Sequence, residues 1–93
     1  MTTKDINKIA LESLAMDLKR VALGYHQGSF KMADRFSQEV LKRKEEVELQ
    51  EVRPYLRKLI ISLPEILDQK DNGKKAEDLL MYSTLFQNYV LTN

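Results

Sequence analysis

The stretch Leu23-Gly24-Tyr25-His26-Gln27-Gly28-Ser29 separates two segments in which apolar residues recur with the spacing of a helix. It contains two of the three glycines in the chain and its single histidine. Glycine commonly ends a helix because it adopts the left-handed backbone conformation without strain. We therefore predict that one helix ends by Gly28, that a second begins at Ser29, and that the two pack antiparallel.

The segment before this corner is predicted to be an amphipathic helix over residues 3–27. Thr2 and Asp5 have the spacing of a capping box, in which two side chains satisfy free amide groups of the first turn. Gly24 lies within the helical pattern, where it either permits close packing or begins the end of the helix. The apolar side carries residues at steps of three and four: Ile6, Ala10, Leu11, Leu14, Leu18, Val21, Ala22 and Tyr25.

A second helix is predicted over residues 29–48. We expect Ser29 to cap it with its side-chain oxygen. Residues 42–51 are mostly charged, and Glu39 is spaced to support Arg43, so this helix is expected to project or fray at its end. Its inward side would carry Phe30, Ala33, Phe36, Val40 and Val47.

A third helix is predicted over residues 50–68, with breaks or kinks at Pro54 and Pro64. Proline lacks an amide donor and clashes with the preceding turn, so each proline opens or kinks a helical segment. Residues 68–75, which include Asp71-Asn72-Gly73, are predicted to form a loop. The last helix is predicted over residues 74–91. The apolar series of the third helix is Leu49, Val52, Leu56, Leu59, Leu63 and Ile66.

Together these segments predict an all-α fold, a small antiparallel bundle of four helices that forms one domain over residues 1–93. A chain of 93 residues is long enough for one modest core. Its content of 43% hydrophobic and 31% charged residues is that of a globular protein and argues against disorder.

The charge balance and the lack of cysteine argue against several classes of function. Fifteen basic and 14 acidic residues give a net charge of +1, too small for a global field that would attract nucleic acid or an anionic membrane. The lack of cysteine excludes disulfides and thiolate chemistry, and it fits a reducing compartment. Charges within residues 1–18 argue against a signal peptide, and no apolar run reaches the roughly 18 residues of a membrane span. We expect a cytoplasmic protein that does not associate with membranes.

The corner is one candidate site, because free amides and the helix dipole at the start of a helix favour an anion. Polar side chains that could bind one there are Arg20, Tyr25, His26, Ser29 and Arg35. His26 could act as a general base or a metal ligand, but the residues one helical turn away offer it no second metal ligand. A capped helix junction with solvated side chains explains the same residues, so this corner ranks as a secondary polar surface.

No catalytic, cofactor-binding or metal-binding residue is assigned from the sequence. Glu45, Glu46 and Glu48 point around their helix instead of converging on one inward side. One histidine without a cysteine does not by spacing alone provide a nucleophile, a base and an orienting acid. We therefore expect neither enzyme activity nor a cofactor.

Nucleic-acid binding is the alternative function. Arg53, Arg57 and Lys58 form the best candidate basic patch, and Tyr55 adds an aromatic ring that could stack on a base. Neighbouring glutamates partly cancel the charge of this patch, and the basic side chains could instead lie along the bundle. A nucleic-acid partner is therefore possible but not favoured.

The last predicted helix carries the strongest signal for binding. Apolar residues cover more than half of its circumference, which is more than one core-facing stripe requires. Residue types enriched in interface cores occur at Met81, Tyr82, Leu85, Phe86 and Tyr89. The same residues could also fill the core of this chain. We predict a small interaction module whose protein partner is a second copy of this chain, bound through this helix to form a homodimer, or another chain.

Overall fold

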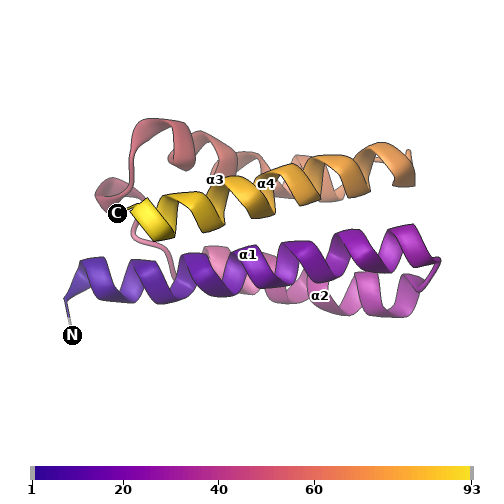
Figure 1. Cartoon of the computed structure of the whole chain (residues 1–93), viewed down its shortest axis with the longest axis horizontal. Coiled ribbons are helices and arrows are strands. Elements are labelled where there is room, and N and C mark those ends of the chain that lie inside the picture. The colour runs from indigo at the N-terminus through magenta and orange to yellow at the C-terminus, as the bar shows by residue number, and fades with distance from the viewer. Residues whose placement is uncertain (1, 93) are drawn as a thin grey trace.

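The computed structural model describes residues 2–92, and within that range the chain forms four α-helices. Helix α1 spans Thr3–Gln27, α2 Phe30–Lys44, α3 Pro54–Leu67 and α4 Asn72–Thr92, and a short 3-10 helix, η1, spans Leu49–Glu51. Each helix runs antiparallel to the next, and α4 returns alongside α1 (Figure 1). The predicted all-α antiparallel bundle of four helices is confirmed.

Helix α1 organises the bundle because it is packed closely on two sides. Its contacts with α4 and α2 are extensive, whereas α3 contacts α4 and α2 more sparsely. A Cβ atom on Gly24 would lie 2.9 Å from the backbone nitrogen of Ala33, so α1 and α2 approach each other at backbone distance there. On the other side, the hydroxyl of Ser83 donates a hydrogen bond of 2.6 Å to the carbonyl of Ala15. Small residues thus bring both neighbours close to α1.

The corner between α1 and α2 has the predicted helix end but not the predicted cap. Gly28 adopts a φ of 75° and closes α1 through hydrogen bonds to the carbonyls of its last turn. The predicted capping box of Thr2 and Asp5 is present at the other end of α1. The side chain of Ser29 makes no capping hydrogen bond, and α2 begins one residue later, at Phe30. The predicted serine cap is therefore wrong.

Helix α2 ends at Lys44, four residues before the predicted boundary. The side chain of Asn7 on α1 keeps Glu48 out of this helix, because it accepts a bond of 2.8 Å from the amide of Glu48 and donates one of 3.1 Å to its carbonyl. This pairing holds Glu48 in an extended conformation, with φ −79° and ψ 99°. A helical backbone could not offer both groups to one side chain.

The boundaries of α3 and α4 also differ from those predicted. The expected break at Pro54 is present, and this residue begins α3, but Pro64 lies inside an uninterrupted helix. Helix α4 begins two residues before the predicted position, because the carboxylate of Asp71 accepts a bond of 3.0 Å from the amide of Lys74 and satisfies the first turn. The predicted loop over 68–75 is correspondingly shorter.

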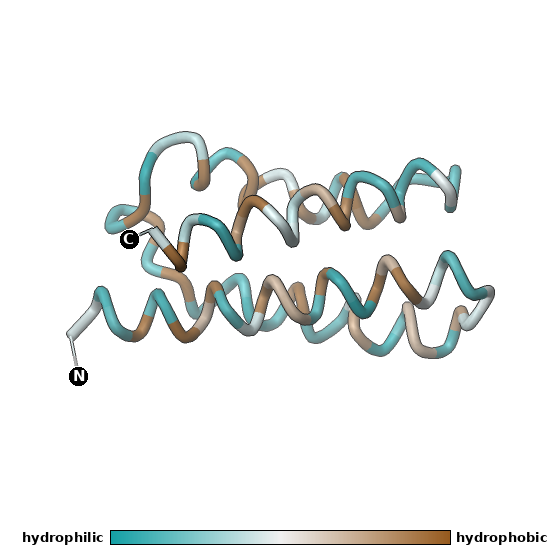
Figure 2. The backbone as a smooth tube through the Cα atoms, in the orientation of Figure 1, coloured by the Kyte–Doolittle hydropathy of each residue, from teal (hydrophilic) through white to brown (hydrophobic). Residues whose placement is uncertain are grey.

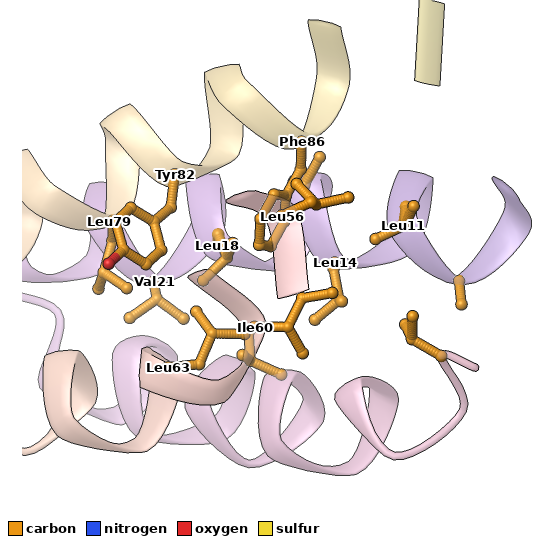
Figure 3. Packing of buried hydrophobic residues seen from close by; sticks show 14 of the residues in the cluster. Leu11, Leu14, Leu18, Val21, Leu56, Ile60, Leu63, Leu79, Tyr82 and Phe86 are labelled. Carbon is orange, nitrogen blue, oxygen red and sulfur yellow. The ribbon is translucent and has the colours of Figure 1, made fainter. Parts of the chain in front are cut away.

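The core runs along the axis of the bundle, and hydrophobic positions recur along all four helices (Figure 2). Side chains of α1, α3 and α4 meet at its centre, among them Leu18, Ile60 and Phe86 (Figure 3). Ile6 and Phe30 were expected inside but are exposed, because they lie at the edges of their apolar stripes. The largest fully buried side chains are Phe86, Leu11, Leu14, Leu18, Leu56, Leu63, Leu79, Val21 and Val40.

Replacement of Gly24 should reveal how close α1 and α2 lie. In an open helix, Gly→Ala stabilises by up to about 1 kcal/mol. Here the added methyl group meets the backbone of Ala33, so we expect Gly24→Ala to lower the free energy of unfolding by about 1–3 kcal/mol in urea denaturation. The matched control is Gly73→Ala, whose methyl group would make only an ordinary contact, and we expect it to be neutral or slightly stabilising. A Gly24→Ala variant as stable as the Gly73→Ala variant would contradict this close approach.

Candidate functional site

The structure divides the predicted polar corner into separate contacts. Tyr25 is half-buried, and its hydroxyl accepts a hydrogen bond of 3.2 Å from the ammonium group of Lys75 on α4. This ammonium group also lies 4.3 Å from the centre of the Tyr25 ring. His26 is exposed, and Ser29 is partly exposed. Tyr25 therefore helps to join α1 to α4, and the sequence did not predict the buried Lys75 beside it.

The two arginines of the predicted corner gather around an aromatic ring. The guanidinium carbons of Arg20 and Arg35 lie 5.2 and 5.6 Å from the centre of the Phe36 ring. Arg20 also donates a hydrogen bond of 3.1 Å to the carboxylate of Asp17. The contact of Arg20 with Phe36 crosses from α1 to α2, whereas Arg35 is exposed and contacts its own neighbour on α2.

Asp17 is a buried carboxylate in this α1–α2 contact, and the sequence reasoning did not select it. Burial raises the pKa of Asp17, while the hydrogen bond and charge of Arg20 oppose that rise. From α2, the charge of Arg43 also lowers this pKa and that of Glu39 raises it. Arg43 itself forms an ion pair of 2.9 Å with Glu46. The sequence could have indicated that Asp17 faces α2, because Asp17 lies seven residues before Gly24 and therefore on the same side of the helix.

The three residues of the predicted basic patch also have different surroundings. The guanidinium group of Arg57 donates hydrogen bonds of 2.9 and 3.3 Å to the carbonyls of Leu49 and Val52, so it holds the connection around η1. Arg53 and Lys58 are exposed, and Arg53 occupies the N-cap position of α3. The role of Arg57 is therefore structural, which weakens the case for a nucleic-acid surface there.

The predicted self-association surface contains both core and surface residues. Phe86 is fully buried, and Tyr82 is buried with its hydroxyl 2.9 Å from that of Ser62 on α3. These two side chains fill the core of their own chain, which corrects their predicted place on a surface. Tyr89 is half-buried and packs edge-on against Tyr55, with 6.2 Å between ring centres. Of the five residues that were predicted, Met81 and Leu85 remain exposed.

An exposed apolar face that the sequence reasoning missed lies on α1 and α4. These two helices are nearest the viewer in Figure 1, with α2 and α3 behind them. A shallow groove of about 340 Å³ runs between them and is lined by residues of both, including Met16, Lys19, Gln87 and Leu91. We define the α1–α4 face by the exposed side chains on this side of the two helices. Those that line the groove are Glu12, Met16, Lys19, Gln87 and Leu91, and those that continue the face beyond it are Ile9 and Leu23 on α1 and Leu80 and Thr84 on α4.

A second hollow, of about 450 Å³, lies where the start of α1 meets the end of α4 and the η1 connection. Its lining mixes the cations Lys4, Lys8 and Arg53 with the carboxylates Asp5 and Glu51, so positive charge is only in slight excess there. Within residues 2–92, no three carboxylate or histidine side chains are grouped so that they could hold a metal ion. In the same range, no helix combines the length and apolar character needed to cross a membrane.

The buried Asp17 carboxylate should make stability depend on pH. A carboxyl group whose pKa is raised by folding binds its proton more tightly in the folded state, so its contribution to stability falls as pH rises through that pKa. We expect Asp17→Asn to be more stable than the wild type at pH 7 and the difference to shrink toward pH 3, as measured by urea denaturation. The pKa of Asp5 is lowered by its hydrogen bonds with Thr2 and gives the opposite trend, so the comparison between variants isolates Asp17. An exposed control, Asp34→Asn, should change little, and a difference for Asp17→Asn that is the same at both pH values would contradict the expectation.

Comparisons with known proteins give this chain no family. No protein-family model matches it, and no curated protein and no solved structure matches it significantly.

Proposed function

We propose that the protein is a small helical interaction module that self-associates through a surface that includes α4, and that it is not an enzyme. The observation that carries this proposal is the excess of apolar side chains on α4. Leu79, Phe86 and Val90 already complete its buried side. Large apolar residues also lie exposed on its outer side: Leu80, Met81, Leu85 and Leu91.

The free-energy cost of leaving these apolar side chains of α4 in water supports an interaction surface. Apolar area gains roughly 25 cal/mol per Å² when it is removed from water, and contiguous exposed apolar patches commonly mark binding sites. Leu91 is 75% exposed, the largest fraction among the exposed large hydrophobic residues. A second copy that covered α4 would bury side chains that the bundle itself leaves in water.

Other functions have weaker support from the same structure. Nucleic-acid binding would need the guanidinium group of Arg57, which is committed to backbone carbonyls. Catalysis at the corner would need His26 to act with Tyr25 and Arg35, but Tyr25 contacts Lys75 and Arg35 contacts Phe36. The lack of cysteine fits a reducing compartment, and the proposal accordingly places the protein in the cytoplasm.

Sedimentation equilibrium over a range of concentrations tests the proposal. We expect the wild type to form dimers and Leu91→Glu to weaken dimerisation at least tenfold, because a charge would replace a buried leucine at the interface. The matched control is Ile61→Glu on α3, since Ile61 is 61% exposed and lies on a different helix. We expect this control to dimerise like the wild type. A wild type that remains monomeric at all concentrations would disprove self-association.

A further inference from the structure

The outer side of α1 carries an apolar stripe that the core does not use. Ile9, Met16 and Leu23 are all exposed and lie seven residues apart. Residues at this spacing drift by only about 20° per step around a helix, so the three side chains form one line of about 21 Å. The stripe lies opposite the core-facing residues Leu11, Leu14 and Leu18, which are fully buried.

Helix α4 extends this stripe into a two-helix face. Leu80, Thr84, Gln87 and Leu91 follow one another at steps of four, three and four, so they share one side of α4. Met16, Gln87 and Leu91 line the same shallow groove, which places the α1 and α4 stripes side by side. The outer side of a surface helix is commonly polar, whereas this face carries Leu80 near the middle of α4, Leu91 near its end and an apolar line along α1.

The spacing of the apolar residues on the α1–α4 face is compatible with a twofold contact between two copies. In a twofold dimer the same patch on each subunit meets the other, so each residue contacts a symmetry-related partner. On α1, Ile9 and Leu23 are equally distant from Met16. On α4, Leu80 and Leu91 are equally distant from the midpoint between Thr84 and Gln87. A twofold axis that passes over Met16, perpendicular to the helices, would therefore bring Ile9 of one copy to Leu23 of the other.

The charges beside the stripe complement each other in the same arrangement. Glu12 and Lys19 are both exposed and both line the groove, on the same flank of the α1 stripe. Neither takes part in any ion pair among residues 2–92. An antiparallel pair of α1 helices centred on Met16 would place Glu12 of each copy next to Lys19 of the other, which forms two ion pairs. Opposite charges in register favour a specific partner orientation.

The α1–α4 face lies on the broad side of the bundle. The bundle measures 39 × 22 × 20 Å, and its broad side in Figure 1 is the one that α1 and α4 form. A partner that docked there would meet the side of the molecule with the largest projected area.

We infer that a second copy of this chain docks on the α1–α4 face, with the two α1 helices antiparallel and centred on Met16. This inference rests on the proposed self-association and specifies its partner surface, its orientation and its charge pairs. A helix from a different protein could also fill the groove, but it would not require the face to complement itself.

Charge reversal tests the register. Glu12→Lys and Lys19→Glu each place like charges at both predicted contacts, and we expect each variant alone to dimerise five- to tenfold more weakly at low ionic strength. The double variant Glu12→Lys/Lys19→Glu restores opposite charges and should dimerise within about twofold of the wild type. An equimolar mixture of the two single variants should form heterodimers as tight as the wild-type dimer, because both contacts are then attractive. Sedimentation equilibrium measures all four samples, and urea denaturation checks that each variant is folded.

The outcomes separate this inference from the proposed function. Wild-type dimers that neither single variant weakens would overturn the antiparallel register while leaving self-association intact. Weakened single variants without rescue in the double variant and in the mixture would overturn it as well, because another arrangement would then be using these residues. A wild type that never dimerises would remove the proposed function and this inference with it. Rescue in both the double variant and the mixture would establish the register.

Discussion

The close approach of α1 to two other helices is the constraint on which the bundle depends. Gly24 allows the backbone of α1 to reach that of α2 at Ala33, and the hydroxyl of Ser83 joins α4 to the carbonyl of Ala15. Two neighbours this close leave α1 one side for the core and one side for solvent. The division of α1 into a leucine core stripe and a separate outer stripe follows from this arrangement.

Much of the fold could be predicted because its signals are local. The capping box of Thr2 and Asp5 and the helix end at Gly28 depend on residues a few positions apart, and the spacing of apolar residues indicates each helix. The end of α2 could not be predicted in this way. The residue that keeps Glu48 out of this helix is Asn7, which is 41 residues from Glu48 in the sequence and reaches it only in the folded bundle.

The candidate sites were harder to predict, because composition does not show which side of a broad apolar helix faces inward. Tyr82 and Phe86 have the residue types of an interface, yet they fill the core, whereas Met81 and Leu85 beside them remain in water. The exposed stripe of Ile9, Met16 and Leu23 on α1 was not predicted, for a different reason. Its three apolar residues are spread among charged ones, and only the arrangement of α1 and α4 brings them together with the leucines of α4.

The connection between α2 and α3 is held from both halves of the chain. Asn7 of the first helical hairpin binds the backbone of Glu48, and Arg57 of the second binds the carbonyls of Leu49 and Val52. The five residues from 48 to 52 therefore belong to both hairpins at once. Neither hairpin can move away from the other without leaving backbone groups of this connection unpaired, which costs free energy. The short connection thus couples the two halves, which favours cooperative unfolding of the four helices over separate opening of either hairpin.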